Sequence, residues 1–304
     1  MTRVTQHAVA LTSLQGLNGN LAALQRLQQQ MTSGKTISQP SDDPTGTNTS
    51  MIVRQGMAGA TQQARNITDG QTFLDSTDSA LQNMLDQVRK VRDLTVQALN
   101  NGALDGPSQQ AIATQVQGIR ESLLGQANLV VQGRPLFGGS TTGSFAYQDD
   151  GTGNYVYGGV GDGTDSRTWM TRQVSDVEQI RVDITGPEAF GVPGSGKDLF
   201  GVVKNVAADV ADPTKLTTDL SDLDNVIDGL TTALADIGTR SARMQTAATN
   251  NSNQQLTLTT KLSQTEDIDL PKTIMNLQMQ QVGYQAALAA TAQALQPTLV
   301  DFLK

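Results

Sequence analysis

Apolar residues near both ends of the chain recur at alternating steps of three and four positions. One repeat comprises Leu14, Leu17, Leu21, Leu24, Gln28 and Met31, and the other comprises Ile274, Leu277, Gln281, Tyr284, Leu288, Thr291 and Leu295. This heptad spacing is typical of helices that pack along one stripe against another helix. A third repeat predicts a long helix over about residues 47–99, through Leu74, Thr77, Leu81, Met84, Val88, Val91, Thr95 and Ala98. The chain is therefore expected to be built from long, paired helices.

Charged residues are nearly absent from the two terminal stretches. Residues 1–41 contain no Asp or Glu, and residues 273–300 contain no charged residue of either sign. A helix in solvent usually carries charges on its outer face, and burying a charge costs far more than burying a hydrogen-bonded amide. We therefore expect other helices to cover these ends in an assembly. The alternative is that low-charge ends are disordered in the free chain, and both can hold.

The composition changes in the middle of the chain. Ten of the glycines lie between Gly133 and Gly163, and eight of the eleven aromatic residues lie between Phe137 and Phe200. Alternating residues at 154–157 and 179–184 predict short strands joined by Gly and Asp turns. The expected fold is mainly α-helical with a small β-rich insert. We predict a terminal coiled-coil assembly domain (1–45 plus 266–304), a helical rod domain (46–134 plus 201–265) and the insert (135–200).

Turn and capping residues set the expected helix boundaries. The first helix should end near Gly34, and Ser41 or Asp42 can cap the next one, with Pro44 in its first turn. Further helices are expected from Ser108 towards Val130, from about Leu216 to Ser263, and from Pro271 to Lys304. Pro297 should kink or end the last of them.

The residues needed for catalysis or metal binding are scarce. The chain has no cysteine, and its single histidine, His7, has no second imidazole or thiol to work with. We expect no enzymatic activity, no cofactor and no metal. Asp149, Asp150, Asp162 and Asp165 could suggest a calcium loop, but their spacing departs from the EF-hand pattern, so hairpin turns are favoured.

Charge and hydropathy bear on the possible partners. A net charge of −8 argues against nucleic acid, and no stretch is long and apolar enough to cross a membrane. The N-terminus lacks the apolar segment of a cleaved signal peptide. The insert leaves one choice open, since its aromatics could either form a binding platform or fill a small core. These aromatics are Tyr147, Tyr155, Tyr157 and Trp169.

Several motifs, in order along the chain, resemble the bacterial flagellin superfamily. Residues 33–44, 70–81 and 91–100 are similar to the end of its first helix and to its second helix. Residues 133–139 (Gly-Arg-Pro-Leu-Phe-Gly-Gly) and 299–303 (Leu-Val-Asp-Phe-Leu) resemble a turn and the C-terminus of the hook–filament junction branch. Pro135 departs from this branch, in which an aromatic residue stands at that position. The resemblance covers about two thirds of the chain.

The resemblance implies a structural subunit of the bacterial flagellum that connects the hook, through the first hook-associated protein, to the flagellin filament. It implies self-association in a ring, a dedicated export chaperone, and export through the flagellar type III apparatus to the cell exterior. A filament flagellin is the near alternative, and an adhesin displaying the insert is a more distant one. The expected assembly seam comprises Leu14, Leu17, Leu21, Leu24, Met31, Ile274, Leu277, Tyr284, Leu288, Leu295 and Phe302.

Overall fold

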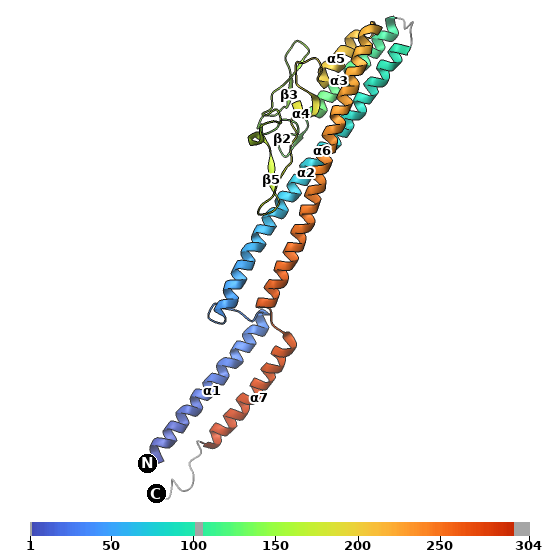
Figure 1. Ribbon diagram of the computed structural model, residues 1–304. Helices are drawn as coiled ribbons and strands as arrows, with labels where there is room; N and C mark the ends of the chain where they lie inside the picture. Colours follow the sequence, from blue (N-terminus) through green and yellow to red (C-terminus); the bar gives the residue numbers. More distant parts are fainter. Residues whose placement is uncertain (1, 101–105, 295–304) are drawn as a thin grey trace. The chain divides into compact units, whose positions relative to one another are not determined.

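Long helices dominate the computed structural model of the chain, which describes residues 2–100 and 106–294 (Figure 1). The helices are α1 (Thr2–Ser33), α2 (Pro44–Asn100), α3 (Gly106–Ala127), α4 (Gly186–Phe190), α5 (Leu199–Asp209), α6 (Pro213–Glu266) and α7 (Leu270–Ala294). The strands are β1 (Val130–Val131), β2 (Arg134–Pro135), β3 (Tyr147–Asp149), β4 (Tyr155–Tyr157), β5 (Thr171–Gln173) and β6 (Gln179–Arg181), and a 3-10 turn, η1, spans Ser166–Thr168. The expected fold class, mainly α with a small β-rich insert, is confirmed.

The chain divides into two compact units. The terminal unit comprises residues 1–59 and 255–304, and the central unit comprises residues 60–254. The three-domain division expected from the sequence places its boundaries elsewhere and remains a prediction. In the terminal unit, α1 and α7 run side by side (Figure 1). Two connectors lead out of this pair, residues 34–43 after α1 and residues 267–269 before α7. An antiparallel bridge between Lys35 and Asp267 joins them.

The start of α2 corrects one sequence-based expectation. Asp43, rather than Ser41 or Asp42, caps the helix, because its Oδ1 accepts hydrogen bonds from the N–H groups of Thr45 (3.0 Å) and Gly46 (2.9 Å). Pro44 then occupies the first helical position, as expected. The Asp42 carboxylate instead accepts from the N–H groups of Ser38 and Gln39 and orders the preceding turn.

The long seam on α2 lies at the centre of the central unit. All eight of its predicted positions, from Leu74 to Ala98, are buried, which confirms the three-four periodicity. The six apolar ones belong to one continuous hydrophobic cluster that also takes in α3, α5 and α6, and α3 packs against α5. At Gly70 the helix comes close to both α6 and the insert, because a Cβ there would lie 2.6 Å from Met244 Cε and 3.2 Å from Val182 Cγ1.

The insert consists of three two-stranded antiparallel sheets, β1–β2, β3–β4 and β5–β6. The strands predicted at 154–157 and 179–184 are confirmed in part of each range. The Asp-Gly pairs form turns as expected: Asp150 Oδ1, for example, accepts from the N–H (2.8 Å) and the hydroxyl (2.6 Å) of Thr152. These bonds hold the pKa of Asp150 at about 2.

Aromatic rings fill the core of the insert. Phe137, Tyr147, Phe190 and Phe200 are buried, and the rings of Phe137 and Phe190 lie 4.8 Å apart. Tyr155 is also buried, whereas Trp169 is 36 % exposed. The five buried rings join the same hydrophobic cluster as the apolar residues of the α2 seam. The insert therefore shares its core with the helices of the central unit.

A buried carboxylate near the α5–α6 turn makes a pH-dependent prediction. Asp219 is 6 % exposed and its Oδ2 has no hydrogen-bond partner. Burial, together with the charges of Asp209 and Asp222 and against that of Lys215, raises its pKa to about 6. Since the native state favours the protonated acid, its stabilising contribution is present below about pH 4 and is lost as the pH rises through 6.

Asp219→Asn should therefore raise the free energy of unfolding by about 1–2 kcal/mol at pH 8 and change it little at pH 4. Denaturant titrations at the two pH values measure this difference. Asp228→Asn, at an exposed position of the same helix, is the control and should have a small effect at both. A gain from Asp219→Asn that is the same at pH 4 and pH 8 would contradict the prediction.

Candidate assembly surfaces

Half of the predicted seam lies where α1 faces α7. Leu17, Leu24 and Met31 of α1 are half-buried, as are Leu277 and Tyr284 of α7. An amide pair lies in the same contact, because Gln280 Nε2 donates to the carbonyl oxygen (3.2 Å) and the Oδ1 (3.3 Å) of Asn20. A polar pair within an apolar stripe favours one register of the two helices over its neighbours.

Four further positions of the predicted seam face solvent. Leu14, Leu21, Ile274 and Leu288 are 37–48 % exposed, while Leu295 and Phe302 lie outside the described residues. The half-buried positions of α1 include Ser13, Leu17, Asn20, Leu24, Leu27 and Met31, which form one stripe, and Ala23 and Gln30 beside it. This stripe keeps the three-four alternation but replaces Leu14, Leu21 and Gln28 with the residues just before them. The exposed leucines therefore border the α1–α7 contact and are open to a further helix.

A second apolar stripe on α7 was missed by the sequence reasoning. Met275, Met279 and Val282 are 55 %, 64 % and 66 % exposed, and they follow one another at steps of four and three. The sequence does hold the signal, because this spacing places three apolar residues on one face of a helix. It was obscured by the adjacent repeat at positions 274, 277, 281 and 284. The helix α7 thus presents apolar side chains on more than one face.

An ion-pair cluster lies where the connectors meet α2 and α6. The Glu266 carboxylate, 7 % exposed, accepts from Arg54 Nη2 (2.7 Å) and Lys35 Nζ (2.8 Å). The backbone bonds beside it run from Thr36 N–H to the Glu266 carbonyl (2.6 Å) and from Ile268 N–H to the Gly34 carbonyl (3.1 Å). Arg54 first, and then Lys35, hold the pKa of Glu266 at about 2. The cluster ties both connectors to α2 and α6.

This arrangement predicts acid sensitivity at the connectors. Because the folded-state pKa of Glu266 is lowered, its stabilisation is complete above about pH 4.5 and is lost as the pH falls towards 2. Glu266→Gln should cost about 1–2 kcal/mol at pH 7, since the two cations are half exposed and screened by solvent. Hydrogen exchange at the Thr36 and Ile268 amides measures the loss as faster exchange. Glu121→Gln, at an exposed position of α3, should leave both amides unchanged; unchanged exchange in Glu266→Gln would refute the prediction.

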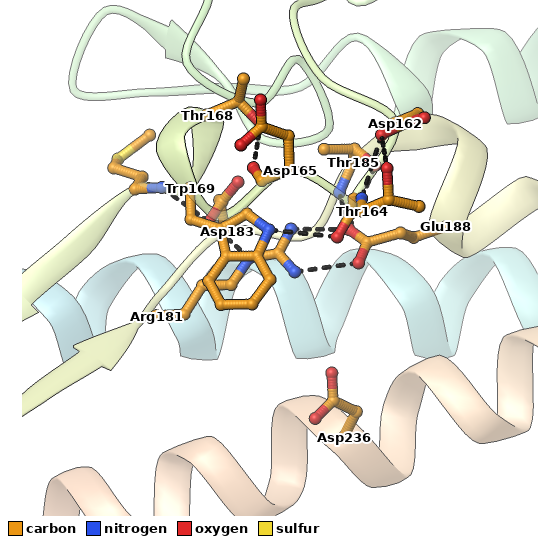
Figure 2. A network of polar contacts seen from close by, with 12 residues as sticks. Asp162, Thr164, Asp165, Thr168, Trp169, Arg181, Asp183, Thr185, Glu188 and Asp236 are labelled. Carbon is orange, nitrogen blue, oxygen red and sulfur yellow. Dashed lines mark hydrogen bonds and ion pairs between the residues drawn. The ribbon is translucent and has the colours of Figure 1, made fainter.

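A polar network fixes the insert against the helices of the central unit (Figure 2). Arg181 donates from Nε to Asp183 Oδ1 (3.0 Å) and from Nη1 and Nη2 to the two oxygens of Glu188 (2.9 and 2.7 Å). Its guanidinium also lies 4.6 Å from the ring centre of Trp169. Burial would raise the pKa of Glu188, but Arg181 and the Thr185 N–H hold it below its usual range.

Within this network Asp183 is fully buried, with no exposed surface. Its Oδ1 also accepts from the Met170 N–H (2.9 Å), and its carbonyl oxygen accepts from Arg240 Nη1 (2.6 Å) on α6. Arg240 in turn pairs with Asp236. The network therefore links β6, α4 and α6, and sequence spacing gave no sign of it.

Other kinds of site find no support in the described residues. No three of their Asp, Glu and His side chains converge closely enough to hold a metal ion, and none of their helices combines the length and apolar content of a membrane span. His7 belongs to α1. The terminal helices α1 and α7 combine exposed apolar side chains with very little charge.

Comparison with known protein families accounts for both ends of the chain. Residues 4–142 match the bacterial flagellin N-terminal helical region, and residues 220–303 match the bacterial flagellin C-terminal helical region. The chain belongs to the bacterial flagellin family. The resemblance expected from residues 33–44, 70–81 and 91–100 is thereby confirmed.

Relatives within the family span nearly the whole chain. The flagellar hook-associated protein 3 of Salmonella typhimurium is 25 % identical over 309 residues, covering 94 % of each protein. The flagellin of Bacillus subtilis is 26 % identical over 308 residues, covering 97 % of this chain and 96 % of its own length. A flagellar hook-associated protein from Vibrio parahaemolyticus has the same fold, with a TM-score of 0.66 at 20 % identity over 74 % of this chain and all of its own.

Proposed function

We propose that this chain is a structural subunit of the bacterial flagellum that forms the junction between the hook and the flagellin filament. Its partners there are the first hook-associated protein, flagellin and further copies of itself in a ring. It acts by assembly and carries out no chemical reaction. The similarity to the flagellar hook-associated protein 3 of Salmonella, which extends over nearly the full length of both proteins, supports this role.

The single observation that carries the assembly mechanism is the exposed apolar surface of the terminal helix pair. Leu14 and Leu21 on α1, and Ile274 and Leu288 on α7, border the α1–α7 contact and remain exposed. Between Lys272 and Ala294 the helix α7 has no charged residue. Surrounding helices can bury such a surface without desolvating a charge. In the proposed assembly, neighbouring subunits supply those helices.

The two alternatives make different demands on the insert and on the filament. An adhesin would present aromatic side chains to its ligand, but Tyr147 and Tyr155 are buried and Trp169 stacks on Arg181. This burial favours a spacer. A filament flagellin remains the nearer alternative, because the flagellin of Bacillus subtilis covers as much of the chain. The two roles differ in what the cell exports when the protein is missing.

We further propose that the chain leaves the cell through the flagellar export apparatus, held before export by a chaperone at its C-terminal region. Deletion of the gene tests the junction role. We expect hooks without filaments, with flagellin accumulating in the medium, and full rescue by a plasmid copy. Filament-free hooks with no flagellin in the medium would instead identify the chain as the filament subunit. Normal filaments in the deletion strain would contradict both roles.

A further inference from the structure

The outward stripe of α7 carries sulfur at two of its three positions. Met275 and Met279 lie one helical turn apart, and Val282 continues the stripe. The face that packs on α1 is different, since it carries Thr273, Leu277, Gln280, Tyr284 and Thr291. The two thioethers are therefore open to solvent in the free chain, and their exposure does not depend on separating α1 from α7.

Four of the other methionines provide a contrast within the same molecule. Met84 and Met244 have no exposed surface and Met170 is 7 % exposed, whereas Met51 on α2 is 66 % exposed. The chain has no cysteine, so its thioethers are its only sulfur groups. Oxidation of a methionine follows its access to the oxidant. Met275 and Met279 should accordingly react well before the three buried methionines.

We propose that Met275 and Met279 form an oxidation-sensitive site that controls whether the subunit can assemble. A peroxide transfers one oxygen atom to each thioether sulfur; the O–O bond breaks, an S–O bond forms, and water leaves. Each sulfur is oxidised by two electrons and the peroxide is reduced by two. A methionine sulfoxide reductase restores each thioether with two electrons from a pair of thiols, which become a disulfide while the oxygen leaves as water. This inference rests on the proposed function, because it needs the stripe to be buried in the assembly.

The physical basis is the polarity of the sulfoxide. In the free chain the sulfoxide oxygen faces water, which supplies its hydrogen bonds, so the oxidised chain should keep its fold. In an apolar contact with a neighbouring helix the same oxygen has no donor, and burying an unpaired polar group is costly. Two such groups on adjacent turns of one stripe should lower incorporation roughly tenfold or more.

The experiment uses the full-length purified chain and hydrogen peroxide. Peptide mass spectrometry should locate the sulfoxides at residues 275 and 279 before residues 84, 170 and 244, while circular dichroism stays unchanged. The treated chain is then added with flagellin to hooks isolated from the deletion strain, and hooks that gain a filament are counted. We expect roughly a tenfold loss, restored by methionine sulfoxide reductase.

Variants assign the loss to α7. Met275→Leu with Met279→Leu removes both sulfurs and keeps the apolar stripe, and should retain full incorporation after peroxide. Met51→Leu, which removes the exposed sulfur on α2, should give no protection. Undiminished incorporation of a chain oxidised at 275 and 279, or equal loss in the double Leu variant, would overturn the inference while the junction role stands. If untreated chain fails to restore filaments, the proposed function fails and the inference with it.

Discussion

Leu24→Asp is expected to abolish incorporation of the subunit while the central unit stays folded. Leu24 is half-buried where α1 faces α7, and a carboxylate there would be desolvated without a partner. That costs several kcal/mol per subunit, and every copy in the proposed ring would carry the same cost. Swimming in soft agar and electron microscopy of the hook tips measure the result, with secretion of the variant checked in the medium.

The matched control is Leu24→Met, which keeps an apolar side chain of similar volume and should assemble normally. Thermal unfolding of both variants should show an unchanged transition for the central unit, to which residue 24 does not belong. A secreted Leu24→Asp variant that builds motile flagella would show that this part of the seam has no role in assembly.

Arg181→Met should lower the free energy of unfolding of the central unit by about 3–5 kcal/mol, more than any other single substitution proposed for that unit. The Arg181 and Asp183 side chains are 9 % and 0 % exposed. Removing the guanidinium leaves the Asp183 carboxylate buried without its cation, and Glu188 loses two hydrogen bonds. Denaturant titration followed by circular dichroism measures the change.

Two further variants separate a buried ion pair from an ordinary one. Arg167→Met removes a cation that is 88 % exposed beside Asp165, and should leave the free energy of unfolding nearly unchanged. Asp183→Asn combined with Arg181→Met should recover part of the loss, because Asn keeps an acceptor for the Met170 N–H without a buried charge. Equal losses in Arg181→Met and Arg167→Met would argue against the network as the main contact of the insert.

Local sequence rules predicted the helices well because most of them rest on periodicity. The seam from Leu74 to Ala98 is buried at every predicted position. An unbroken three-four alternation places these residues on one face of α2, and that face packs against the other helices of the central unit. The cap of α2 was displaced by one residue, to Asp43. Ser41, Asp42 and Asp43 can all cap a helix, and only the turn that Asp42 closes with Ser38 and Gln39 decides between them.

In the terminal helices, periodicity alone does not predict which face of α1 contacts α7. Leu14, Leu17, Leu21 and Leu24 form one sequence repeat, yet only Leu17 and Leu24 face α7. A helix with apolar residues on adjacent faces offers more than one stripe, and the choice between them depends on the partner. Here Asn20 and Gln280 form a hydrogen bond across the contact. A search for apolar periodicity cannot identify such a pair, because both residues are polar. The assembly role of the exposed residues stays a prediction.

The contacts of the insert could not be foreseen for a different reason. Arg181, Asp183 and Glu188 lie close together in sequence, but their meaning depends on Trp169, Met170 and Arg240, which only the folded chain brings beside them. For the aromatic residues, composition left open a binding platform or a small core, and Tyr147 and Tyr155 lie in the core whereas Trp169 is partly exposed. The buried rings join the cluster that includes the apolar residues of the α2 seam, so a unit that reads as separate in sequence shares its interior with the helices.

The paired connectors near Glu266 have a mechanical consequence. Lys35 and Asp267 form an antiparallel bridge, and the backbone bonds of Thr36 and Ile268 cross between the same two segments. A pull on α1 alone would shear these bonds sideways and pass part of the force to the chain that enters α7. The two connectors thus share a tensile load. The connectors are linked by one β-bridge, its backbone hydrogen bonds and the Glu266 carboxylate. This short link resists sliding of the two connectors past each other more than it resists bending.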